Sequence, residues 1–181
     1  MNYFEFFEIP VTFFLDEADL KRRFYQNSKK FHPDFYTLHG EEKQAEILEQ
    51  STINNEAYST LSDFDRRMKY VLELKGMLAE EDKNTLPQDF LMEMMDINEG
   101  IMALELESDT TEYARLHERV KNIEEALFND ILPTLERYDD GTVTPEELES
   151  VKEFYLKKRY LLRILENLDR FAPASKEVGK S

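Results

Sequence analysis

Cysteine and tryptophan are absent from the 181 residues, and glycine (5) and proline (6) are scarce. Without cysteine the chain can form no disulfide bond and no thiolate-ligated metal or iron–sulfur site. Few glycines and prolines favour helices over turn-rich β structure. No stretch alternates with a sustained period of two, and no apolar run approaches the ~20 residues that span a bilayer. The composition therefore predicts an all-α protein without membrane contact.

Lys, Arg and His residues are also few. The chain has 23 Lys and Arg residues against 39 Asp and Glu, a net charge of −16, which argues against nucleic-acid binding. The three histidines, His32, His39 and His117, are joined by no HxxxH or HxxE pattern, so we expect no metal site. The start, MNYFEFFEIP, lacks the basic and apolar regions of a signal peptide, and we expect a cytoplasmic protein.

Helical periodicity divides the chain into two blocks. The first covers residues 1–76. Its expected elements are a short helix capped by Asn2 and ended by Pro10, helices over 16–31, 41–61 and 64–76, and a loop over 32–39. A polar linker over 77–87 leads to the second block, 88–172, which is followed by a flexible tail, 173–181. Helices are expected there at about 88–106, 110–138 and 145–171.

The turn "DDGTVTPEE" before the last helix combines a Thr144 cap, Pro145 at the first helical position and acidic residues in the first turn. These features predict a strong helix start. The turn also hints at a calcium loop, but the first and third ligand positions would then be Glu136 and Tyr138, which argues against that interpretation.

The helix expected over 16–31 has one apolar and one basic face. Leu20, Phe24 and Phe31 fall on the same side at about 100° per residue. The opposite face and its edges carry charged or amide side chains: Arg22, Arg23, Gln26, Lys29 and Lys30. The positive charge of this helix is thus expected to point away from the core.

His32, Pro33 and Asp34 follow this helix directly. His32 and Asp34 could act as a base and its orienter in a stand-alone hydrolase, but no nucleophile motif, metal set or phosphate loop accompanies them. The ordinary interpretation is a helix stop, because Pro33 prevents the helix from continuing. A rigid loop beside a basic helix face also suits docking to an acidic partner surface.

The helix expected over 88–106 has two apolar faces. One is a narrow seam with spacings of four and three, formed by Phe90, Met94, Ile97, Ile101 and Leu104, which suits a bundle core. Leu91, Met92, Met95 and Met102 lie about 100–200° away from it. This second face either packs on the other bundle helices or the first block, or forms an exposed Met-rich patch with an acidic rim. Gly100, in mid-helix, costs about 1 kcal/mol and has no explanation in the sequence.

These motifs together resemble a known family. An HPD tripeptide between two helices is the signature of the J-domains of DnaJ-like co-chaperones. The stretches "NYFEFFEIP", "LKRRFYQNSKKFHPDF", "STINNEAYSTLSDFDRRMKYVLELKG" and "DFLMEMMDINE" resemble, in this order, the HscB-type co-chaperones of iron–sulfur cluster assembly. The resemblance covers roughly residues 2–106 and, more loosely, "KRYLLRILENL" near the end.

The resemblance implies an L-shaped protein with an N-terminal J-domain helical hairpin and a C-terminal three-helix bundle that binds the scaffold. It implies a non-enzymatic co-chaperone without a cofactor. Such a protein stimulates the ATPase of a DnaK/HscA-class chaperone and delivers an IscU-type scaffold to it, which promotes iron–sulfur cluster transfer. A general J-domain co-chaperone whose second block binds unfolded clients is the alternative.

Carried over by position, the resemblance implies two sets of contact residues. The chaperone-binding set is Arg22, Gln26, Lys29, Lys30, His32, Pro33 and Asp34. The scaffold-binding set is Leu91, Met92, Met95, Asp96, Glu99, Ala103 and Tyr160. For Tyr160, simple core packing is the alternative interpretation. Asn54, Asn55, Arg66 and Arg67 also fall within stretches that match the family.

Overall fold

The computed structural model describes residues 1–173, without the side chain of Asp82. Within these residues all regular structure is helical and no strand occurs. The predicted all-α class is therefore confirmed. None of the helices described is both long enough and apolar enough to cross a membrane. Apart from Pro173 itself, the predicted flexible tail lies outside the described residues.

The chain divides into two compact units, each described by itself. Unit 1 comprises Met1–Ala79 together with Thr134–Leu148. Unit 2 comprises Glu80–Pro133 and the chain from Glu149 onward. The sequence also predicted two parts, and its bounds, 1–76 and 88–172, stay a prediction. The loop that joins the last two helices, however, groups with unit 1, whereas the sequence placed it within the second block.

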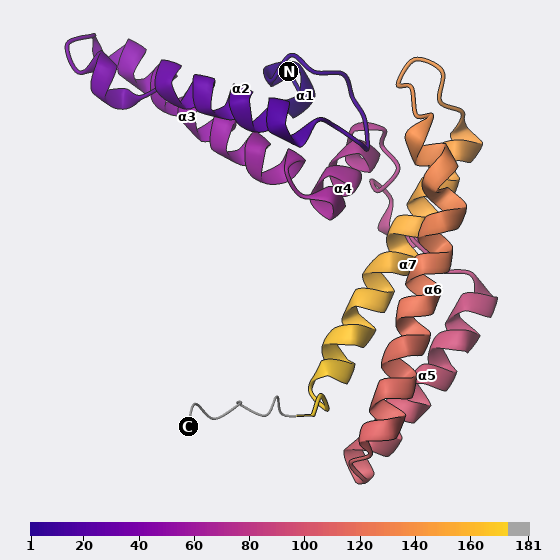
Figure 1. The fold of residues 1–181 in the computed structure, drawn as a ribbon. Helices are drawn as coiled ribbons and strands as arrows, with labels where there is room; N and C mark the ends of the chain where they lie inside the picture. The colour runs from indigo at the N-terminus through magenta and orange to yellow at the C-terminus, as the bar shows by residue number, and fades with distance from the viewer. Residues whose placement is uncertain (174–181) are drawn as a thin grey trace, which may run out of the picture. The chain divides into compact units, whose positions relative to one another are not determined.

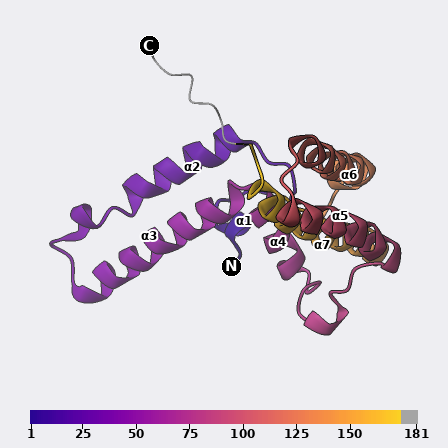
Figure 2. The ribbon, with the colours of Figure 1, turned by 90° about the horizontal axis from the view of Figure 1, so that it is seen from below.

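Unit 1 is built around a long helical hairpin (Figure 1). Its elements are α1 (Tyr3–Phe6), α2 (Glu17–Lys30), a 3-10 turn η1 (Pro33–Tyr36), α3 (Glu41–Leu61) and α4 (Phe64–Leu74). α2 and α3 run side by side, and η1 lies in the loop at the tip of their hairpin (Figures 1 and 2). Asn2 caps α1 in a capping box with Glu5, and Asp16 caps α2. The sequence placed α2, α3 and α4 within two residues of their observed ends, whereas α1 ends at Phe6, four residues before the Pro10 that was expected to end it.

Arg67 connects the end of α3 to the loop around Phe13. Its side chain is buried, and its guanidinium donates hydrogen bonds to the carbonyls of Phe13 and Leu61. Leu61 is the last residue of α3, whose final carbonyls lack partners within the helix. Burial lowers the pKa of Arg67. One buried cation thus caps α3 and holds the loop around Phe13 in place.

Unit 2 contains a 3-10 turn, η2 (Glu81–Lys83), and three helices, α5 (Gln88–Leu106), α6 (Thr110–Glu136) and α7 (Pro145–Asp169). The end of α6 and the first turn of α7 belong to unit 1. The predicted seam of α5 is confirmed, since all five of its residues are at most 5% exposed and pack in one cluster with side chains of α6 and α7. The core of unit 2 therefore follows the spacing read from the sequence.

Gly100 is explained by the contact between α5 and α6. A Cβ atom at this position would lie 2.9 Å from Cδ2 of Leu116, which is fully buried. Real Cβ atoms do not approach another carbon so closely, so the glycine makes room for Leu116. Gly100 lowers the helix propensity of α5, but the close approach of Leu116 leaves no room for a larger residue.

The loop between α6 and α7 is bound to unit 1 by one ring contact and one ion pair. The ring of Tyr138 packs edge-on against Phe13, with centroids 4.8 Å apart. Asp140 accepts a hydrogen bond from the Tyr138 hydroxyl at 2.7 Å and pairs with Nζ of Lys75 at 2.5 Å. Lys75 holds the pKa of Asp140 below its usual range, and burial raises the pKa of Tyr138. These contacts explain why the loop groups with unit 1.

Candidate functional site

The loop at the tip of the α2–α3 hairpin is ordered by its own short-range contacts. His32 is the N-cap of η1, and its Nδ1 atom accepts a hydrogen bond from the backbone N–H of Asp34 at 3.3 Å. The same nitrogen lies 3.6 Å from Oδ2 of Asp34. The His32 ring also meets Phe35 edge-on, with centroids 5.7 Å apart. Since Nδ1 faces the loop, Nε2 is the ring nitrogen left for an external partner.

All three residues of the tripeptide are exposed. The side chains of His32 and Asp34 are 52% and 84% accessible to solvent. A catalytic base normally sits in a sheltered cleft whose environment shifts its pKa, and this pair lacks such shelter. The geometry is that of a small, pre-ordered protrusion that another macromolecule can contact.

The basic face of α2 lies next to this loop in sequence. Arg22, Gln26, Lys29 and Lys30 are exposed, as the sequence predicted. Arg22 pairs with Asp19. Hydrogen bonds from Arg23 and, to a lesser extent, from Arg22 lower the pKa of Asp19. Lys29 and Lys30, the last two residues of the helix, form no ion pair with any residue of 1–173. The unpaired positive charge of this face is therefore concentrated beside His32.

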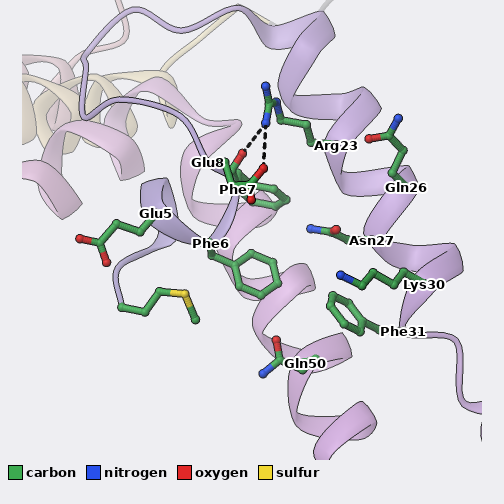
Figure 3. A pocket seen from close by; sticks show the side chains of 11 residues that line it. Glu5, Phe6, Phe7, Glu8, Arg23, Gln26, Asn27, Lys30, Phe31 and Gln50 are labelled. Carbon is green, nitrogen blue, oxygen red and sulfur yellow. Dashed lines mark hydrogen bonds and ion pairs between the residues drawn. The ribbon is translucent and has the colours of Figure 1, made fainter.

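Arg23 is only half-buried and is used within unit 1. Its Nη1 donates to the carbonyl of Phe7 at 2.9 Å and lies 3.9 Å from Glu8, as Figure 3 shows. It borders a pocket of about 310 Å³ between α1, α2 and α3. Side chains that line this pocket include Phe6, Arg23, Gln26, Asn27, Lys30, Phe31 and Gln50 (Figure 3). Gln26 and Lys30 are thus shared by the pocket and the basic face.

Asn54 supports the basic face from behind. It is 1% exposed, and its Nδ2 donates to the carbonyl of Phe24 and to Oγ of Ser28, both at 3.2 Å. Both acceptors belong to α2, whereas Asn54 belongs to α3. This pair of bonds sets the register of the hairpin and therefore the position of Lys29 and Lys30 relative to α3.

The second apolar face of α5 is exposed. Leu91, Met92, Met95 and Met102 are 37%, 60%, 61% and 63% accessible. The interpretation that they pack on other helices is therefore wrong, and the exposed patch is confirmed. Asp96, Glu99 and Ala103 are exposed as well, which gives the patch its acidic rim. Sequence reasoning missed Leu106, which is 92% exposed at the end of the same helix.

Tyr160 lies at the border between core and surface. Its ring is half-buried against the core cluster and meets Phe90 edge-on, with centroids 5.9 Å apart. Its hydroxyl lies 3.5 Å from Nδ2 of Asn98 on α5. The core packing weighed for this residue is thus present, and its role as a partner contact stays a prediction.

The carboxylates of Asp139 and Asp140 in the α6–α7 loop form hydrogen bonds within the loop or an ion pair with Lys75. Oδ1 of Asp139 accepts hydrogen bonds from the backbone of Gly141 and the hydroxyl of Thr142. Among residues 1–173 no three His, Asp or Glu side chains are grouped as metal ligands would be.

The exposed HPD loop on a two-helix hairpin and the three-helix second unit are the features by which this chain resembles the J-domain co-chaperones. Residues 86–169 match the model of the family described as the HSCB C-terminal oligomerisation domain. These residues thus form an HscB C-terminal domain, and the resemblance of the chain to the HscB-type co-chaperones is confirmed.

Curated relatives carry the same family name. The co-chaperone protein HscB homolog of Vibrio cholerae serotype O1 (strain M66-2) is 40% identical over 61% of this chain and 62% of its own length. The chain thus spans about three fifths of the relatives matched at this identity. The HscB homolog of Pasteurella multocida (strain Pm70) is 25% identical over 87% of this chain and 94% of its own length.

Two solved structures share the fold. The crystal structure of human co-chaperone protein HscB superposes with a TM-score of 0.72 at 26% identity, over 94% of this chain and 81% of that one. Chaperone HscB from Vibrio cholerae superposes with a TM-score of 0.65 at 24% identity, over 94% and 99% of the two chains, and supports the fold alone.

Proposed function

We propose that this protein is a cytoplasmic, non-enzymatic co-chaperone with two separate binding surfaces. The HPD loop and the basic face of α2 stimulate the ATPase of a DnaK/HscA-class chaperone. The exposed face of α5, with Tyr160 at its edge, binds an IscU-type scaffold and delivers it, which promotes iron–sulfur cluster transfer. The observation that carries the proposal is that the predicted chaperone contacts are exposed on unit 1, and the predicted scaffold contacts of α5 are exposed on unit 2.

The chaperone surface suits an acidic partner. Lys29 and Lys30 place unpaired positive charge beside the loop, on a chain whose net charge is −16. Like-charge repulsion would keep an acidic chaperone away from the rest of the molecule, so this patch sets the orientation of the encounter. His32 then makes the specific contact through Nε2, because its Nδ1 is held by the loop. The reaction catalysed is the chaperone's own ATP hydrolysis.

The scaffold surface combines adaptable side chains with negative charge. Met92 and Met95 are flexible and polarisable, and suit a partner surface of irregular shape. The exposed carboxylates of Asp96 and Glu99 favour a partner with basic residues around an apolar centre. Asp96 is 3.9 Å from Arg119, too far for a strong pair. Its charge therefore remains available to a partner.

Two variants separate the proposed functions. We expect His32→Gln to lower stimulated ATP turnover to the chaperone's basal rate while scaffold binding, measured by calorimetry, stays unchanged. Leu91→Ser with Met95→Ser should do the reverse and weaken scaffold binding by about 100-fold or more. His39→Gln changes an exposed histidine later in the same loop; it is the matched control and should retain both activities. Loss of both activities in each folded variant would contradict the division of labour.

A general J-domain co-chaperone that binds unfolded clients is the second candidate. The exposed methionines favour it equally, because Met-rich surfaces accept many partners. Calorimetry of the wild-type chain against an IscU-type scaffold and against a denatured model protein distinguishes the two. Binding to the denatured protein alone would select the general co-chaperone.

A further inference from the structure

The apolar face of α5 continues beyond the positions implied by the family resemblance. Leu91, Met95, Met102 and Leu106 are spaced by four, seven and four residues. At about 100° per residue they fall within roughly 60° of one another around the helix. With a rise of 1.5 Å per residue, this line extends over about 22 Å. It reaches one turn past Met102, to the end of α5.

The contacts of α5 with its neighbours leave this line uncovered. Toward α7, Glu105 pairs with Arg170 at 3.2 Å, and Asn98 approaches Tyr160. Toward α6, Asp96 faces Arg119, and Gly100 receives Leu116. These contacts lie on either side of the line around the helix. Met102 and Leu106, 63% and 92% exposed, therefore point away from the rest of the bundle.

Two kinds of partner could cover this face: a second copy of the chain or a different protein. The charge of the face decides between them. Glu99 lies on the same face, is exposed and has no ion-pair partner among residues 1–173. An antiparallel pairing of two copies centred on this line would bring Glu99 close to its own counterpart, and repulsion between like charges opposes that pairing. A different protein with an elongated apolar surface and Lys or Arg at its rim meets no such opposition. Such a partner also complements a chain of net charge −16.

We infer that Met102 and Leu106 extend the scaffold-binding surface, so that the scaffold contacts α5 over its full length through a continuous apolar line. This inference rests on the proposed function, since it assigns further contact residues to the same partner. The scaffold must then present an apolar strip about 20 Å long with basic residues along it. A long strip of this kind fixes the axial position of the partner on the helix, which a compact patch does not.

The test compares scaffold affinities by calorimetry. Met102→Ser with Leu106→Ser should weaken binding by about 10-fold or more, because two apolar contacts are lost. Leu38→Ser with Leu48→Ser, which removes two exposed leucines of unit 1, is the matched control and should bind as the wild type does. Circular dichroism should show unchanged folding in both variants, since all four side chains face solvent.

Three results would overturn the inference. Equal scaffold affinity of the Met102→Ser/Leu106→Ser variant and the wild type would refute the extension but leave the proposed function intact. Self-association of the wild type that is lost in this variant, measured by sedimentation, would make a second copy the occupant. Failure of the wild-type chain to bind any IscU-type scaffold would refute the proposed function and, with it, this inference.

Glu99→Lys should also weaken scaffold binding, because the rim of the partner is expected to be basic.

Discussion

The two units hold their helices together by different means and expose different surfaces. Unit 1 buries two polar side chains, Arg67 and Asn54, which bind backbone carbonyls of neighbouring segments. In unit 2 the α5 seam is apolar, and a glycine allows α5 and α6 to approach closely. The buried polar side chain of this unit, Lys152, donates to the carbonyl of Lys83 in η2 and not to another long helix. On the surface, unit 1 presents a charged loop with defined geometry, whereas unit 2 presents flexible apolar side chains.

The difference matches what each surface is proposed to do. Hydrogen bonds are directional, so buried polar side chains fix the register of α2 against α3 and the position of the HPD loop. Apolar packing is not directional and leaves a helix face that is smooth and adaptable. A surface that triggers one chemical event needs directional hydrogen bonds that fix its position. A surface that retains a partner needs only apolar packing beneath it.

Replacing Arg67 by Met tests the polar support of unit 1 and should have the largest effect. The carbonyls of Phe13 and Leu61 would lose their charged donor inside the protein. We expect unfolding free energy to fall by about 2–4 kcal/mol. Hydrogen exchange should report faster exchange in α3 and α4 than in α5. Arg66→Met is the matched control, since Arg66 is exposed, and should cost at most about 0.5 kcal/mol. Equal losses in the two variants would mean that burial of Arg67 contributes nothing.

Replacing Gly100 by Ala tests the close packing of unit 2. Overpacking against Leu116 costs about 1–3 kcal/mol, and the gain in helix propensity returns about 1 kcal/mol. We expect a net loss of about 1 kcal/mol in a chemical denaturation experiment. In a Leu116→Ala background the clash is absent, so the same Gly100→Ala change should stabilise the helix. Additive effects in this double-mutant cycle would contradict the role assigned to Gly100.

The ion pair between Lys75 and Asp140 tests whether the α6–α7 loop is bound to unit 1, and its effect should be the smallest. Lys75 lowers the folded-state pKa of Asp140. The pair therefore stabilises the fold above the unfolded pKa of Asp, near 4, and this contribution is lost as pH falls through the lower folded value. Asp140 is partly exposed, so a few tenths of a kcal/mol is the expected scale.

The measurement is the stability difference between the wild type and Lys75→Gln as pH falls from 7 to 2.5. We expect this difference to shrink toward zero at the acid end. Lys69→Gln, which removes an exposed ion pair with Glu73, is the control and should change stability by a smaller amount. A difference that stays constant with pH would show that Lys75 acts by packing and not through the charge of Asp140.

Most of the elements could be predicted from the sequence because their signals are local. Asp16 and Asp63 are cap-type residues at the starts of the helices predicted over 16–31 and 64–76, and the helix break before Pro33 follows from the geometry of proline. The seam of α5 was also predictable, because its spacing depends only on the period of one helix. The two short 3-10 turns, in the HPD loop and in the linker, carried no comparable signal.

The role of Gly100 could not be predicted, because it depends on Leu116 of another helix. The same holds for Arg67, which read as one more basic residue of a matching stretch and proved to be a buried cap of α3. Leu106 was missed because the scaffold-binding positions implied on this helix by the resemblance end at Ala103. The grouping of the α6–α7 loop with unit 1 depends on Tyr138 and Asp140 meeting Phe13 and Lys75, residues more than 60 positions away.

The sequence by itself determined the all-α class, the limits of the longer helices to within a few residues and the position of the HPD loop, because caps, breaks and helical periods are properties of neighbouring residues. Only the tertiary structure decided which of the apolar and charged side chains remain exposed. Burial depends on which helices meet, and that is settled by contacts between residues far apart in the chain. The exposed face of α5 and the cation buried at Arg67 are the two outcomes that local patterns did not specify.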